Sequence, residues 1–109
     1  MTDGYRNEAL AAALARTDVS AIGDAVRAGR VVVPLLDHGR VRVFPGEHGY
    51  EVMVFSSVDS LSLFLADDDN RLARLQGGEE LRTFLASNRE EIAHVTFDPA
   101  GPHPLRTGL

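Results

Sequence analysis

Two adjacent serines raise the main chemical question in this sequence. Ser56 and Ser57 directly follow the apolar run 52–55, and a serine after a buried strand is where an α/β hydrolase places its nucleophile. That nucleophile needs the pattern Gly-x-Ser-x-Gly, because the flanking glycines relieve close contacts in a strained turn. Val54 and Val58 stand at those positions around Ser56. The spacing therefore argues against a hydrolase using Ser56 or Ser57, and we expect no catalytic residues.

The same serines fit the beginning of a helix. Apolar residues recur at helical spacing just beyond them, at Val58, Leu61, Phe64 and Leu65. We interpret Ser56 as the N-cap, with Asp59 as the acid at the third helical position of a capping box. An enzyme would instead require Asp59 and Asp98 to converge on Ser56. Only the tertiary structure shows whether these three side chains meet.

No metal site or cofactor is expected. The chain has no cysteine, and its histidines show neither the i, i+4 spacing of a zinc helix nor a tight cluster; they are His38, His48, His94 and His103. The acidic run 67–70 fails the calcium-loop pattern, because Leu72 stands where glycine is required and Gly78 where an acid is required.

Length and charge limit the class of protein. With 109 residues, of which 44% are hydrophobic, residues 1–109 fit one domain. The formal net charge of −5 disfavours nucleic acid and anionic membranes as partners. The first residues lack a signal-peptide pattern and no apolar stretch is long enough to span a bilayer, so we expect a cytoplasmic protein. Every basic residue is arginine, which suggests a GC-rich bacterial genome.

The first half of the chain predicts a helical pair followed by strands. Helical spacing marks 5–16, and a second helix is capped by Asp18 and ends at Gly29. Three strands follow in a meander at 30–36, 40–44 and 50–55. Pro34 cannot donate to a ladder, so the first should be an edge strand; the last is apolar on both faces and should lie inside the sheet.

The second half alternates helices with strands. Beyond the helix after Ser57, the pattern predicts a short strand at 71–76, a helix opened by Gly78, a last strand at 92–99 and an irregular tail at 99–109. We therefore expect an α/β (α+β) fold: a single domain with one mixed, mostly antiparallel sheet of about five strands, flanking helices and the N-terminal helical pair.

Several short motifs resemble one known family. They are Val33-Pro34-Leu35, Phe55-Ser56-Ser57 with Asp59, Gly78 with Glu80-Leu81, and Asp98-Pro99-Ala100. Their order is similar to that of the SseB-type N-terminal domain family, over about residues 10–105. Ser56 replaces a threonine of the family pattern, and Asp98-Pro99-Ala100 replaces Asn-Pro-Gly, so roles for an asparagine amide or a positive-φ glycine do not carry over.

The resemblance implies a small α/β domain that is not established as an enzyme, and in GC-rich Gram-positive bacteria a link to secretion systems. We therefore expect a non-catalytic protein-interaction domain, accessory to secretion, whose partner is an unidentified protein. Candidate contact residues are Pro34, Phe44, Tyr50, Leu105 and Leu109. Strand addition at the Pro34 edge is a further route, and it is compatible with a homodimer.

The alternative is a small-ligand-binding or sensor domain. The Phe55-Ser56-Ser57 turn and Asp98 both follow strand C-termini, where ligands gather in open α/β sheets. Ser56, Ser57 and Asp98 are its candidate binding residues, and a pocket of several hundred Å³ between these loops would favour it.

Overall fold

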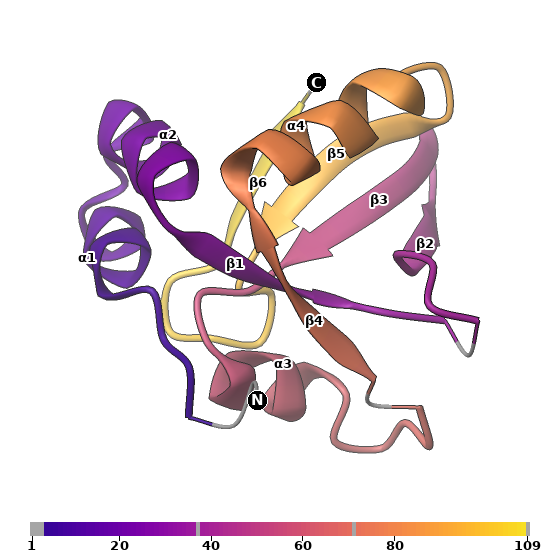
Figure 1. The fold of residues 1–109 in the computed structure, drawn as a ribbon, viewed down its shortest axis with the longest axis horizontal. Coiled ribbons are helices and arrows are strands. Elements are labelled where there is room, and N and C mark those ends of the chain that lie inside the picture. Colours follow the sequence, from indigo (N-terminus) through magenta and orange to yellow (C-terminus); the bar gives the residue numbers. More distant parts are fainter. Residues whose placement is uncertain (1–3, 37, 71, 109) are drawn as a thin grey trace.

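The computed structural model describes residues 4–36, 38–70 and 72–108. Helices and strands are mixed along the chain (Figure 1), as expected for the α+β class. Their bounds are α1 Glu8–Arg16, α2 Val19–Ala28, β1 Arg30–Pro34, β2 Val43–Gly46, β3 Gly49–Val54, α3 Val58–Phe64, β4 Ala73–Gly77, α4 Gly78–Ser87, β5 Ile92–Phe97 and β6 Leu105–Gly108. None of the helices in this part of the chain has the length and apolarity needed to cross a bilayer.

The strands form two sheets rather than the single one expected. Strands β2, β3, β5 and β6 make a four-stranded sheet in that order, and β1 pairs with β4 in a separate two-stranded sheet. Among the strands of the described residues, β3 and β5 pair in parallel and the other named pairs are antiparallel. The predicted interior position of β3 is confirmed, since β2 and β5 flank it. Figure 1 shows β1 and β4 crossing the four-stranded sheet, with α4 on one side and α3 on the other.

The predicted meander is therefore wrong at its first strand. Strand β1 pairs along its length with β4, from Arg30 opposite Gly77 to Pro34 opposite Ala73. Its link to β3 is an isolated bridge in which Val32 and Phe55 exchange two backbone hydrogen bonds of 2.9 Å. Alternation in a sequence fixes which face each side chain takes, but it leaves the neighbouring strand undetermined.

The expected irregular tail also needs correction. Residues Leu105–Gly108 form β6, which pairs antiparallel with β5 from Phe97 opposite Leu105 to His94 opposite Gly108. The prolines of this segment and Gly101, which suggested an irregular tail, lie in the turn 98–104 that connects β5 to β6. Leu109 lies outside the described residues.

Two hydrophobic clusters fill the fold. The larger joins α1, α2 and α4 to the sheets and includes Leu10, Ile22, Val31, Leu81 and Val95. The smaller lies under α3, where Leu61 and Leu65 pack with Val32, Met53 and Phe55. Side chains from β1 and β3 enter both clusters, so the crossing of these strands connects the two halves of the core.

The N-terminal helical pair is held by a residue that the sequence analysis overlooked. Asn7 caps α1 by accepting a 3.0 Å hydrogen bond from the backbone of Leu10. Its amide nitrogen donates to the carbonyl oxygens of Arg30 at 2.9 Å and Ala25 at 3.3 Å. One buried side chain thus joins α1, the end of α2 and β1. The predicted cap of α2 by Asp18 and its stop at Gly29 are confirmed.

Gly78→Ala should destabilise the fold. A Cβ at Gly78 would lie 2.4 Å from the carbonyl oxygen of Val26, so α2 and α4 would have to separate, at a cost of about 1–3 kcal/mol. Gly23→Ala is the matched control. Its Cβ would meet only the flexible end of Arg27 at 3.3 Å, and replacing a helical glycine should stabilise by about 0.5–1 kcal/mol. Urea unfolding measures both; equal effects would refute the close α2–α4 contact.

Gln76→Leu should stabilise the fold. Gln76 is 3% exposed and lies opposite Val31, so its side chain points to the larger core cluster. Its side-chain oxygen has no hydrogen-bond partner in the described part of the chain. Removing an unsatisfied buried oxygen should raise the free energy of unfolding by about 1 kcal/mol. A lower free energy in urea unfolding would mean that the amide makes a bond essential to the sheet.

Candidate functional site

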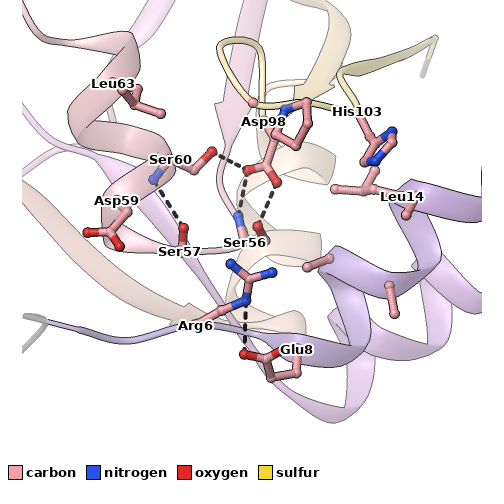
Figure 2. A pocket seen from close by; sticks show the side chains of 15 residues that line it. Arg6, Glu8, Leu14, Ser56, Ser57, Asp59, Ser60, Leu63, Asp98 and His103 are labelled. Carbon is pink, nitrogen blue, oxygen red and sulfur yellow. Dashed lines mark hydrogen bonds and ion pairs between the residues drawn. The ribbon is translucent and has the colours of Figure 1, made fainter.

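A cleft of about 440 Å³ opens between α1, α3 and the turn after β5. We call it the Asp98 cleft. Figure 2 shows Ser56, Ser57, Ser60 and Asp98 gathered at its floor. Alanines of α1 form one wall, Leu63 of α3 belongs to the opposite wall, and the turn 98–104 contributes His103.

The floor of the cleft is a hydrogen-bond network centred on the carboxylate of Asp98. This residue is 7% exposed. Its Oδ1 accepts hydrogen bonds from the backbone nitrogen of Ser56 and from Ser60 Oγ, both at 2.8 Å, and its Oδ2 accepts from Ser56 Oγ at 2.6 Å. Three donors thus offset the cost of burying the carboxylate.

Strand pairing brings these residues together. Strands β3 and β5 are parallel with Val54 opposite Phe97, so the residues that follow both strands emerge at the same edge of the sheet. The backbone nitrogen of Asp98 donates to the carbonyl of Val54 at 2.9 Å. Asp98 then turns the chain with a positive φ of 45°, a conformation that aspartate tolerates better than most residues.

The cap of α3 is Ser57, which corrects the prediction of Ser56. Ser57 Oγ accepts a 3.0 Å hydrogen bond from the backbone nitrogen of Ser60. Asp59 therefore stands at the second helical position rather than the third and takes no part in a capping box. The physical reason is that the hydroxyl and the backbone nitrogen of Ser56 both donate to Asp98.

The two serines differ from an activated nucleophile in their hydrogen bonds. Ser56 Oγ donates directly to a carboxylate and Ser57 Oγ accepts from a helix nitrogen, whereas serine catalysis pairs the hydroxyl with a base that a third group orients. His103 lines the cleft, but within the described chain it makes no hydrogen bond with either serine. Ser56 and Asp98 do converge, and Asp59 lies outside their network.

The mouth of the cleft carries an ion pair. Arg6 Nε lies 2.9 Å from Glu8 Oε1, and these side chains are 54% and 78% exposed. Solvent screens such a pair, so it contributes little to stability. Arg6 lines the cleft while its Nε is paired with Glu8, as the dashed line in Figure 2 shows.

The structure places the predicted contact residues in several strands. Tyr50 is 46% exposed, Phe44 and Leu105 are half-buried and lie in different strands, and Leu109 lies outside the described residues. Pro34 requires a correction, because its side chain is fully buried. Its strand edge is not free either: the carbonyl of Pro34 accepts from Arg42 at 2.9 Å, and Val32 is bonded to Phe55. Strand addition at this edge is therefore blocked.

Potential metal ligands are dispersed. Over residues 4–36, 38–70 and 72–108, no three His, Cys, Asp or Glu side chains come together as they would around an ion. His94 is half-buried and its Nδ1 lies 3.1 Å from an Arg106 nitrogen.

Ser60 is the member of the site that sequence reasoning missed. It is 8% exposed and donates to Asp98. Its four-residue spacing from Ser56 is visible in the sequence, but Ser56 precedes the helix and only the fold brings both hydroxyls to Asp98. Leu63 and Arg6 were missed as well, since only the folded chain brings α1 beside α3.

Comparison with known proteins identifies a family. The family model described as the SseB protein N-terminal domain matches residues 7–106. No curated protein and no solved structure matches the chain.

Substitutions at Asp98 should show how much its side-chain hydrogen bonds contribute to stability. Asp98→Ala leaves the three donors of Ser56 and Ser60 without their acceptor and should cost about 3 kcal/mol. Asp98→Asn keeps an acceptor oxygen and tolerates positive φ, so we expect a loss of about 1 kcal/mol. Asp59→Ala, an exposed acid outside the network, should change stability by less than about 0.5 kcal/mol. Equal urea midpoints for all three variants would refute the role of the network.

Proposed function

We propose that this chain, which belongs to the SseB protein N-terminal domain family, is a non-catalytic domain that binds a segment of a partner protein in the Asp98 cleft. The observation that carries the proposal is the cleft itself. It has a volume of about 440 Å³ and a floor whose side chains are fixed by mutual hydrogen bonds. A prearranged recess lowers the entropy cost of binding.

The hydrogen bonds at the floor favour binding over catalysis. Both serine hydroxyls serve the fold, Ser56 by holding Asp98 and Ser57 by capping α3. A nucleophile needs a hydroxyl that a base can deprotonate beside the substrate. The absence of an enzyme activity is therefore part of the proposal, and the candidates Ser56, Ser57 and Asp98 serve as binding residues.

The shape of the cleft favours a protein segment over an enclosed small molecule. Small-ligand pockets bury most of the ligand surface, whereas residues from both walls of this cleft, such as Ala12, Ala15 and Asp59, are exposed. Leu63 at the wall is 64% exposed, and an exposed leucine beside a cleft suits an apolar side chain of a partner. An extended segment crossing between α1 and α3 would contact both walls.

The biological setting belongs to the same proposal. The resemblance to SseB-like proteins links the domain to bacterial secretion, and we propose that the partner is a secretion component in the cytoplasm. The formal net charge of −5 supports a protein partner rather than nucleic acid or an anionic membrane.

A small ligand is the second candidate, because the cleft volume lies within the range of small-molecule sites. Thermal unfolding with a panel of metabolites tests it, since a ligand bound only by the folded state raises the melting temperature. If a compound raises the melting temperature of wild type and Leu72→Ser but not of Leu63→Ser, that ligand, rather than a partner segment, is the occupant of the cleft.

Leu63→Ser should weaken partner binding without unfolding the domain. Its side chain is 64% exposed, so we expect less than about 0.5 kcal/mol of lost stability. Leu72→Ser is the matched control, since Leu72 is 50% exposed and lies away from the cleft. The measurement is affinity capture of the tagged domain from native-host lysate, followed by mass spectrometry.

We expect one partner that wild type and Leu72→Ser retain and Leu63→Ser loses. The same proteins with all three baits would contradict binding in the cleft. Sedimentation of the purified domain is the accompanying control, since concentration-dependent association that Leu63→Ser abolishes would identify a second copy of this chain as the occupant.

A further inference from the structure

We propose that the Asp98 cleft binds the ammonium group of a lysine side chain carried by the partner segment, an inference that rests on the proposed function. It derives from an excess of hydrogen-bond acceptors at the floor. A carboxylate offers about four acceptor positions. Among the described residues, Asp98 uses two on Oδ1 and one on Oδ2. One position on Oδ2 is therefore open to a further donor.

The serine oxygens add to this excess. The hydroxyls of Ser56 and Ser60 each donate their proton to Asp98, so their oxygens face the cleft as acceptors only. Ser57 accepts from the backbone of Ser60 and retains its hydroxyl proton. That proton can donate to a backbone carbonyl of the bound segment. The floor thus offers three side chains with acceptor positions to a ligand that brings donors.

An ammonium group matches this arrangement better than a guanidinium. Its three donors spread around one nitrogen and can reach separate acceptors. A guanidinium binds best as a fork across both oxygens of one carboxylate, and Oδ1 of Asp98 already holds two hydrogen bonds. An anionic group would meet the Asp98 carboxylate at the floor, and the Arg6 cation that lines the cleft is already paired with Glu8.

The charged side chains around the cleft also favour a cationic ligand. Glu8 offsets Arg6 through their ion pair. Among the other residues that line the cleft, Asp98 at the floor and Asp59 at the wall are two acids, and His103 is the one further basic side chain. The sequence contains no lysine, so none of residues 1–109 can supply the lysine side chain.

The test is an NMR titration of the ¹⁵N-labelled domain with capped pentapeptides. The probe is acetyl-Ala-Ala-Lys-Ala-Ala-amide, and the comparison peptides carry norleucine or glutamate at the centre. Norleucine keeps the length and apolarity of lysine without its charge. We expect the lysine peptide to shift the amides of Ser57, Ser60 and Asp98 and to bind at least tenfold more tightly than either comparison peptide, which is about 1.4 kcal/mol.

Substitutions of two exposed side chains test whether the cleft prefers a positively charged ligand, and they leave the hydrogen bonds of the floor intact. Arg6→Gln removes a cation from the mouth and should strengthen lysine binding about threefold, while Asp59→Asn should weaken it by a similar factor. Arg74→Gln and Asp69→Asn are the matched controls, because they change the net charge by the same amount at exposed positions away from the cleft. Both controls should leave the affinity unchanged.

Equal binding of the lysine and norleucine peptides, or weaker lysine binding in Arg6→Gln, would overturn the inference. The proposed function fails separately. If affinity capture depends on Leu63 but no lysine peptide binds, the partner segment uses other chemistry and the proposed function stands. If lysine peptides bind at the floor and capture is insensitive to Leu63, the ammonium site stands without the proposed partner.

Discussion

The hydrogen bonds to the Asp98 carboxylate join the turn after β5 to Ser56 and Ser60, which lie 42 and 38 positions earlier in the chain. Asp98 follows β5, Ser56 follows β3, and Ser60 lies within α3. A carboxylate that is 7% exposed needs donors, because burial removes its water. Each donor also gains a fixed acceptor, so the network holds α3 against the ends of the two parallel strands. Both the smaller core cluster and the cleft depend on this attachment.

The crossing of β1 over the end of β3 is the second constraint. Val32 and Phe55 exchange backbone hydrogen bonds, and both side chains are fully buried in the cluster beneath α3. Since the next residue after Phe55 is Ser56, the crossing and the Asp98 network fix adjacent positions of one strand end. The same geometry that closes the core thus sets the floor of the cleft.

The cleft exists because α1 and α3 are anchored separately. Asn7 ties the start of α1 to the end of α2 and to β1, while Asp98 and Ser57 position α3. Small side chains on α1, such as Ala12 and Ala15, leave the space between the helices open. In the proposed function, this space receives the partner segment, and the acceptor-rich floor selects its anchoring side chain.

The sequence by itself determined the types and order of most elements and the α+β class. The helix bounded by Asp18 and Gly29 illustrates why, since caps and periodicity are local signals. Sequence also placed Ser56, Ser57 and Asp98 at strand ends. Only the tertiary structure decided that β1 pairs with β4, that Leu105–Gly108 completes the sheet, and that Ser57 rather than Ser56 caps α3. These outcomes follow from contacts between distant residues: Asp98 lies 42 positions from Ser56 and takes both of its donors, and no local pattern encodes that competition.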